Sequence, residues 1–409
     1  MPGYFQGTDG DLENTYVTDY AMIDQYAKTG SLWMTGGNSY GSLGTNAGGQ
    51  TTSPVQTVAA GTNWKQASYS ASNAGAVKTD GTLWLWGRNN YGQLGDNTGG
   101  GDSFNKSSPV QTVAAGTNWK QLSIGPDGGS TFVSAVKTDG TLWTWGKNDF
   151  YQLGDGTATR RSSPGQMSGG GNNWKQVSSG GQHASGIKTD GTLWMWGSNH
   201  YGQAGINSNS GGGNWGNLPS TPVQTIAAGT NWKQVECGQF HTAAIKTDGT
   251  LWVWGRNSYG QLGRNNNTDM SSPVQTSVAG TNWKQVSGKG QSVAAIKTDG
   301  TLWLWGRNFY GGLGDGTVNA RSYPAQTVAG GSNWKFVDTS QFHTAAIKTD
   351  GTLWTWGGTG ARLGQGSFAS KSSPAQTVAG GSNWKTVATG TGGTAAIYFY
   401  DAGNLYPSA

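Results

Sequence analysis

Short stretches that alternate between apolar and polar residues, separated by glycine-rich turns, recur along the whole chain. One of them reads KTDGTLWTWG at residues 348–357, and close copies begin at residues 78, 137, 188, 246 and 297. Asp-Gly favours a tight β-hairpin, because both residues tolerate a positive φ. In LWLW at residues 83–86 both alternating faces are apolar, which predicts a strand that is covered on its two sides.

Two further markers repeat with the hairpin at nearly constant spacing. The tryptophan of an NWK triplet follows 10 residues after a proline that usually ends an SSP triplet, and the KT lysine recurs in steps of 50 to 59 residues. Each unit holds four short strand candidates bounded by turn residues. Seven such units predict an all-β protein, a seven-bladed β-propeller of four-stranded antiparallel blades. The NWK tryptophans are Trp64, Trp119, Trp174, Trp232, Trp283, Trp334 and Trp384.

The two ends of the chain carry incomplete copies of the hairpin. Residues 395–406 form an eighth, degraded copy, and residues 21–33 form a degraded first copy. We expect the N- and C-terminal hairpins to meet and close the ring, so that residues 21–409 form one propeller domain after an acidic arm at residues 1–20. Which hairpin completes the last blade stays open at this point, and an eight-bladed ring would leave one blade half built.

The loop after the second tryptophan of the hairpin is also repeated. It reads WGRNNYGQLGDN at residues 86–97 and WGKNDFYQLGDGT at 145–157, while GQHA occurs at 181–184 and QFHTAAI at 239–245. These motifs resemble the repeat of the regulator of chromosome condensation family, and the resemblance extends from about residue 21 to residue 406. It implies the propeller fold but no single activity, since propellers host many unrelated functions.

The founding member of that family is a nucleotide exchange factor for a small nuclear GTPase and binds chromatin. This chain lacks a large insertion like that member's GTPase-binding wedge, and its first 27 residues contain no Lys or Arg. We therefore do not expect exchange activity. The near-identical sequences of the units instead resemble those of the family's bacterial and phage relatives, which implies a surface or virion-associated protein.

Charge and composition narrow the range of partners. The net charge is +5, but fourteen of the 26 basic residues are lysines at two fixed repeat positions, so they are dispersed and we expect no nucleic-acid partner. Cys237 is the single cysteine, which excludes an internal disulfide framework. Without a recognisable signal peptide or an apolar run of membrane-spanning length, we expect no membrane insertion.

The candidate catalytic and metal-binding groups all have structural explanations. Three of the four histidines share one repeat position: His183, His241 and His343. Other units carry residues as different as Phe132 and Gly393 there, which a ring of metal ligands would not tolerate, so we interpret these histidines as structural groups that bond neighbouring backbone. Cys237 is expected to be a small buried residue, and the hairpin aspartates are turn residues. We expect no catalytic residue, no metal and no cofactor, and hence no enzyme.

Differences in length between the units indicate where a binding surface lies. Three insertions occur at residues 97–106, 124–132 and 206–220, in consecutive blades, the second to the fourth. In a meandering four-stranded blade these connections leave from the same face, which predicts one interaction surface there. Twenty of the 21 tryptophans occupy repeat positions and are expected in the core. The candidate surface residues are Phe104, Asp127, Phe132, Asn214 and Trp215.

These observations favour a non-catalytic structural or interaction propeller. We expect a bacteriophage virion protein in a tail, baseplate or capsid-decorating position, assembled in the host cytoplasm and acting in assembly or host attachment. Its partners would be other virion or surface proteins, with the N-terminal arm as one docking element. The alternative is a lectin-like propeller on a bacterial surface that binds cell-surface glycans, since exposed Trp and Asn suit sugar faces and hydroxyls.

Overall fold

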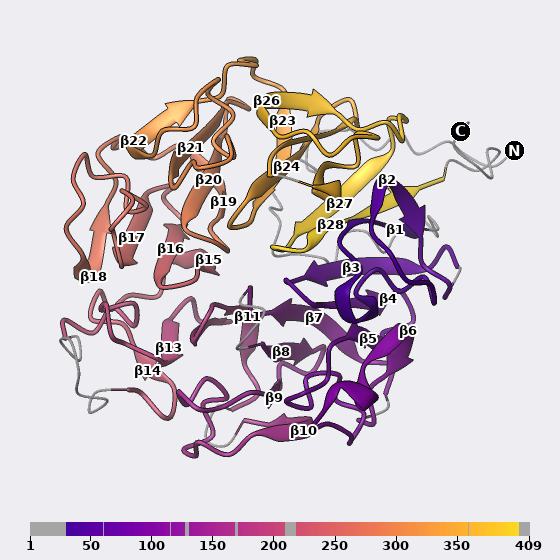
Figure 1. The fold of residues 1–409 in the computed structure, drawn as a ribbon. Helices are drawn as coiled ribbons and strands as arrows, with labels where there is room; N and C mark the ends of the chain where they lie inside the picture. The colour runs from indigo at the N-terminus through magenta and orange to yellow at the C-terminus, as the bar shows by residue number, and fades with distance from the viewer. Residues whose placement is uncertain are drawn as a thin grey trace, which may run out of the picture.

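Seven four-stranded antiparallel sheets are arranged as blades around a common axis (Figure 1), as the repeat predicts. The computed structural model describes residues 30–400 apart from 60, 115, 127–130, 168–170, 209–217 and 359. These described residues contain no α-helix, and none of their helical turns is long and apolar enough to cross a membrane. The 3₁₀ turns are η2 (Ser39–Gly41), η3 (Asp102–Phe104) and η5 (Ala361–Leu363).

Each blade is a meander in which the four strands follow one another from the axis to the rim. We number the blades from the one that contains β1. The inner strands are β27 (Trp384–Thr389), β3 (Trp64–Tyr69), β7 (Trp119–Ile124), β11 (Trp174–Ser179), β15 (Trp232–Cys237), β19 (Trp283–Ser287) and β23 (Trp334–Thr339). The second strands are β28 (Gly393–Phe399), β4 (Asn73–Lys78), β8 (Phe132–Lys137), β12 (His183–Lys188), β16 (His241–Lys246), β20 (Ser292–Lys297) and β24 (His343–Lys348).

The other two strands of each blade lie toward the rim. The third strands are β1 (Gly30–Gly36), β5 (Leu83–Gly87), β9 (Leu142–Gly146), β13 (Leu193–Gly197), β17 (Leu251–Gly255), β21 (Leu302–Gly306) and β25 (Leu353–Gly357). The outer strands are β2 (Thr51–Gln56), β6 (Lys106–Gln111), β10 (Arg161–Gln166), β14 (Val223–Gln224), β18 (Met270–Gln275), β22 (Arg321–Gln326) and β26 (Lys371–Gln376).

The first blade joins the two ends of the propeller. Its strand order is β2-β1-β28-β27, so the C-terminal part of the chain supplies the inner two strands and the N-terminal part the outer two. Strands β1 and β28 pair along their whole length, from Gly30 opposite Phe399 to Gly36 opposite Gly393. The predicted closure of the ring by the two ends is therefore confirmed, and neither end completes the blade alone. The proposed arm at residues 1–20 lies outside the described residues.

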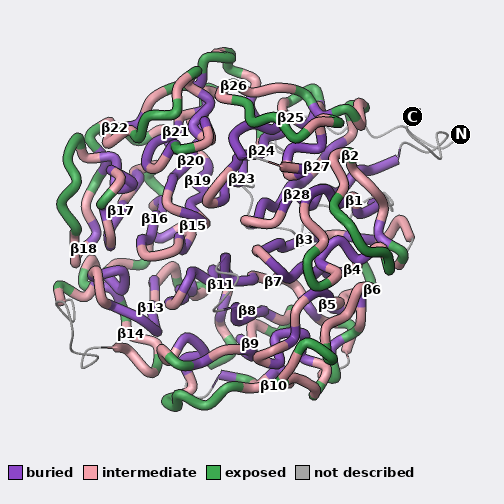
Figure 2. The backbone as a smooth tube through the Cα atoms, in the orientation of Figure 1, coloured by how far each residue is buried: buried purple, intermediate pink, exposed green. Residues whose placement is uncertain are grey.

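The hydrophobic core lies between neighbouring blades. One cluster, for example, joins Leu85 of the second blade to Trp119 and Trp145 of the third. Trp86 shows why the YGQLG loop is repeated: its indole nitrogen donates to the Ser42 carbonyl of the preceding blade at 2.9 Å. Gly44 lies against that ring with φ +65°, and a Cβ there would be 2.8 Å from the indole nitrogen. Figure 2 shows the buried residues along the blades and the exposed ones mainly at the rim.

The KT lysine is part of this packing. The ammonium of Lys78 lies 4.9 Å from the ring centroid of Trp64 and 4.6 Å from that of Trp84. The same pair of contacts recurs in the third to seventh blades, and each cation–π contact contributes about 0.5–1 kcal/mol. In the first blade Tyr398 takes the place of the lysine and packs on Trp384. The repeated hairpin therefore serves the scaffold.

The antiparallel meander gives the propeller two faces with different connections. The inner-to-second and third-to-outer connections leave from one face, and the second-to-third turns and the exits to the next blade leave from the other. The three length insertions lie between β5 and β6, between β7 and β8, and between β13 and β14. All three connections therefore start and end on the first face, which we call the insertion face, in the second, third and fourth blades.

Candidate functional site

The inner strands of all seven blades line a central cavity. In each inner strand the NWK tryptophan is buried between blades, and the residues two and four positions after it line the cavity. The wall of the cavity is therefore built from a few repeat positions, and any departure from the repeat at these positions gives one sector of the wall a chemistry of its own.

A glutamine two positions after the tryptophan links five blades to their neighbours. The Gln66 side-chain amide donates to the Leu122 carbonyl at 2.8 Å and accepts from the Leu122 N–H at 2.9 Å. We call this two-way bond a glutamine clamp. The remaining clamps join Gln121 to Val177, Gln176 to Val235, Gln234 to Val286 and Gln285 to Val337. The seventh and first blades carry Phe336 and Thr386 at this position instead.

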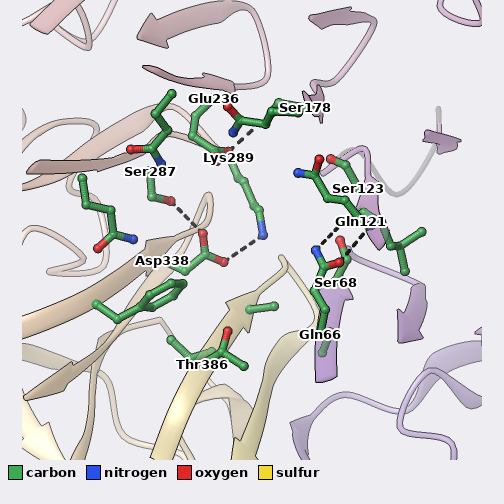
Figure 3. Close-up of a pocket in the computed structure, with 18 of the residues that line it drawn as sticks. Gln66, Ser68, Gln121, Ser123, Ser178, Glu236, Ser287, Lys289, Asp338 and Thr386 are labelled. Carbon is green, nitrogen blue, oxygen red and sulfur yellow. Dashed lines mark hydrogen bonds and ion pairs between the residues drawn. The ribbon is translucent and has the colours of Figure 1, made fainter. Parts of the chain in front are cut away.

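Four positions after the tryptophan, the wall changes from serine to acid. Ser68, Ser123, Ser178 and Ser287 each accept a backbone N–H from the next blade. Asp338 makes the equivalent bond to the Thr389 N–H at 2.6 Å, and it also accepts from the Ser287 hydroxyl at 2.7 Å. Lys289 completes its surroundings with an ammonium 2.9 Å from the carboxylate (Figure 3). The Asp338 side chain is only 8% exposed, so this ion pair is part of the buried wall.

Glu236 occupies the same repeat position in the fifth blade but has few partners. The Ser178 hydroxyl donates to its carboxylate at a long 3.4 Å. Burial raises the pKa of Glu236 to about 7, the Lys289 ammonium opposes that rise, and the Asp338 carboxylate adds to it. Together Glu236, Lys289 and Asp338 form what we call the charged sector, which lies in the fifth to seventh blades near the insertion face.

The charged sector can change its net charge close to neutral pH. It carries one net negative charge when Glu236 is ionised and none when Glu236 is protonated. The Ser287 hydroxyl donates to Asp338, and the described residues that line the cavity include no histidine that could act as a base toward it. Within the described part of the chain, no group of three or more His, Cys, Asp or Glu side chains is placed to hold a metal ion. The wall therefore offers hydrogen bonds and charge.

Comparison with known proteins places this architecture in a family. A model of the RCC1-like domain matches residues 128–398, and one of the regulator of chromosome condensation (RCC1) repeat matches residues 80–128. The chain belongs to the RCC1-like domain family. The expected family resemblance is thus confirmed, whereas the narrower resemblance to bacterial and phage members stays a prediction.

Individual proteins that are similar to this RCC1-like propeller include two plant proteins in sequence and a yeast protein in fold. The Arabidopsis thaliana proteins RUG3, a mitochondrial RCC1 domain-containing protein, and UVR8, an ultraviolet-B receptor, are each 29% identical to it over 68% and 70% of the chain. The matches span only 62% and 63% of those two proteins. The structure of yeast RCC1 (Prp20) bound to Kap60 superposes with a TM-score of 0.79 at 17% identity, over 98% of this chain and 96% of that one.

The structure describes two of the five predicted surface residues. Phe104 ends η3 on the insertion between β5 and β6 and is 37% exposed. The prediction for Phe132 is wrong: it is the first residue of β8, fully buried in the core between the third and fourth blades. It takes the repeat position of the histidines, which faces a neighbouring blade. Asp127, Asn214 and Trp215 lie outside the described residues.

The histidines and the cysteine are buried parts of the RCC1-like framework. His183 and His343 bond the hydroxyls of Thr242 and Thr394 in the next blade, at 3.0 and 2.8 Å. The structural interpretation holds for these two rings, which also bond the neighbouring backbone at His241 and Gly393. Burial lowers the pKa of His183 and His343 to about 3, which keeps them neutral. Cys237 is fully buried, with its thiol 3.1 Å from the Ser185 hydroxyl.

The charged sector was not predicted from the sequence, although the sequence contains a signal for it. Glu236 is one of two glutamates in the chain and stands where four units have serine. Lys289 stands where the other units have glycine or serine. These substitutions leave the spacing of the units unchanged, so the insertion pattern does not reveal them. Residue-by-residue alignment of the seven NWK strands would have found them.

Proposed function

We propose that this RCC1-like protein is a non-catalytic interaction propeller that engages a partner through the insertion face of its second to fourth blades. The observation that carries the proposal is topological: three lengthened connections leave one face of three consecutive blades. Measured from the loop glycine to the proline, the spacing is 14 and 17 residues in two of these blades and 10 in every other unit. Variable loops on a rigid scaffold are the usual location of binding sites.

Most of the potentially reactive side chains among the described residues are engaged in packing or ion pairing, which supports a binding role. The described histidines at the shared repeat position, the cysteine and the repeat tryptophans are committed to packing, and Lys289 and Asp338 are paired with one another. RCC1-like propellers are in general interaction folds, and yeast Prp20 is described in complex with Kap60. That partner is a property of Prp20; it supports a class of function here and does not identify the partner.

Within this class we propose a structural protein of a phage virion, which docks on neighbouring virion proteins or on the host surface. A disulfide-free ring with seven strictly repeated units suits a rigid mechanical part. Mass spectrometry of purified virions tests this context directly. The protein should be recovered in stoichiometric amount with the tail or capsid proteins, and recovery only from the host lysate would contradict the virion role.

The binding surface is tested separately with two exposed aromatic residues on equivalent loops. Phe104→Ser alters the insertion of the second blade, and Phe309→Ser is the matched control on the uninserted loop of the sixth blade, where Phe309 is 51% exposed. We expect Phe104→Ser to reduce incorporation into particles and Phe309→Ser to leave it unchanged. Equal effects would argue against the insertion face. Glycan-array binding that is lost in Trp215→Ala would instead favour the lectin alternative.

A further inference from the structure

Two arginines of the fifth and sixth blades lie over aromatic rings at the insertion face. The guanidinium carbon of Arg256 lies 4.8 Å from the ring centroid of Tyr201 in the fourth blade and 5.6 Å from that of Phe240. The guanidinium carbon of Arg307 lies 5.5 Å from the ring centroid of Tyr259 in the fifth blade. Both arginines directly follow a third strand, so they begin connections that leave from the insertion face. We call these two residues the arginine pair.

The hydrogen-bond partners of the arginine pair inside the protein are uncharged. The Arg256 Nε donates to the Ser258 hydroxyl at 2.9 Å, and the Arg307 Nη1 donates to the Gln291 amide oxygen at 2.9 Å. The Gln291 amide in turn donates to the Gln239 oxygen at 2.7 Å, so this chain of bonds ends in the N–H groups of Gln239. Across the residues that the structure describes, neither guanidinium forms an ion pair with a carboxylate. The surface around the arginine pair therefore offers N–H donors and positive charge.

The third blade shows the same arrangement with its charge neutralised. Lys147 occupies the repeat position of the arginine pair and lies, together with Arg160, over a tyrosine of the second blade. Asp149, two residues after Lys147, lies 3.6 Å from its ammonium and 3.2 Å from the Arg160 guanidinium. The fifth blade carries Ser258 at the position of this aspartate, and the sixth blade carries an aromatic residue. Asp269, at the far end of the fifth-blade connection, accepts a backbone N–H instead. The arginine pair thus lacks the internal acid that the third blade provides.

We propose that the arginine pair binds the carboxylates of an acidic peptide segment on a partner protein. The planar fork of a guanidinium matches a carboxylate and can donate two parallel hydrogen bonds to it. A ring beneath the guanidinium restricts its orientation before binding, so less conformational freedom is lost when the ion pair forms. This inference rests on the proposed function only in its use of the insertion face. It concerns the fifth and sixth blades, and the insertions lie in the second to fourth.

The surroundings of the arginine pair favour a short acidic segment over a nucleic acid. Neighbouring guanidiniums on this face are already paired, Arg160 with Asp149 and Arg321 with Asp315. The unpaired positive charge is therefore local, whereas a phosphate backbone needs a continuous basic track. The tyrosines also have little ring surface left for bases to stack on, because a guanidinium lies over each ring and a phenylalanine packs against it.

Fluorescence anisotropy with the purified full-length protein tests the proposal. The acidic probe is a fluorescein-labelled peptide of alternating glutamate and glycine, the neutral probe replaces each glutamate with glutamine, and a single-stranded oligonucleotide is the nucleic-acid probe. The variant R256Q/R307Q removes both charges, and the matched control K106Q/K371Q removes the same charge from the first residues of two outer strands. S258D keeps both arginines and places an acid beside Arg256, as in the third blade. Circular dichroism and urea unfolding verify that each variant folds.

We expect the affinity for the acidic probe to fall about tenfold in R256Q/R307Q, about threefold in S258D and less than about twofold in the control. No binding of the acidic probe, equal binding of the neutral probe, equal losses in the control or an unchanged affinity in S258D would overturn the proposal. Tighter arginine-dependent binding of the oligonucleotide would also overturn it and would assign this surface to nucleic acid. The incorporation of Phe104→Ser into particles is a separate measurement, so failure of the arginine pair and failure of the proposed function can be told apart.

Discussion

The two ends of the inner strands carry charge in opposite ways. At one end, lysine follows the NWK tryptophan in all seven inner strands. Near the insertion face the charged sector uses three different residues, and Lys289 is paired with Asp338 inside the wall. Identical charges at one repeat position cannot neutralise one another. A charge that breaks the repeat can find its partner in the fold, so it acts on stability.

The largest effect should come from Asp338→Ala. The substitution leaves the Lys289 ammonium, the Thr389 N–H and the Ser287 hydroxyl without their acceptor inside the wall. We expect the free energy of unfolding to fall by about 3–5 kcal/mol, as for other broken buried ion pairs. Urea unfolding at pH 7 measures it. Asp350→Ala, on an exposed hairpin, should cost about 1 kcal/mol, and equal losses would show that the buried pair has no special role.

Glu236→Gln should show how the ionisation of Glu236 changes the stability of the protein. The pKa of Glu236 is raised to about 7 from an ordinary value of 4.5, so the folded state holds the proton more tightly than the unfolded state. The stability of the protein should therefore fall as the pH rises from about 4.5 to about 7, and the full penalty remains above that range.

The glutamine variant removes this penalty. At pH 8 it should be more stable than the natural protein by on the order of 2 kcal/mol, and the difference should vanish below pH 4. Urea unfolding of both proteins at a series of pH values measures the difference, in which the contributions of unchanged groups cancel. A difference that is the same at every pH would show that folding does not raise the pKa of Glu236.

The glutamine clamps, which lie between the two ends of the inner strands, allow a test of how much one repeated contact between blades adds to stability. The interface between the first and second blades lacks a clamp, because Thr386 stands where five blades have glutamine. Thr386→Gln should let the new amide bond the Ala67 backbone and raise the free energy of unfolding by about 1 kcal/mol. Thr386→Leu, of similar size but without the amide, is the control. A gain in both variants would be due to volume and not to the clamp.

The repeated parts of the fold could be predicted from the sequence, and the parts that depart from the repeat could not. The hairpin, the blade and the ring follow from the period, because Asp-Gly turns, paired tryptophans and the LG glycine impose the same local structure in every unit. The pairing of β1 with β28 was not predictable in detail, since both ends carry degraded hairpins and only packing decides which strand is inner. Phe132 was misplaced because it adjoins an insertion, although its repeat position marks it as core.

The charged sector was missed for a different reason. Glu236, Lys289 and Asp338 lie in three different blades, at residues that are 49 to 102 positions apart in the sequence. Only closure of the ring brings these three inner strands around one cavity. Sequence spacing locates them within their units but does not show that the lysine reaches the acid of the next blade, because that depends on the distance between neighbouring inner strands.

The smallest effect should come from Lys335→Gln, which removes one of the seven lysines that follow the NWK tryptophans. Lys335 is the exposed member, so its loss should change the free energy of unfolding by no more than about 0.5 kcal/mol, with a slight gain from reduced repulsion. Urea unfolding at low salt and in 1 M salt measures this gain. It should disappear at high salt, where the Debye length is about 3 Å. A loss above about 1 kcal/mol at either salt concentration would show that Lys335 stabilises the fold, and the contrast with the charged sector would fail.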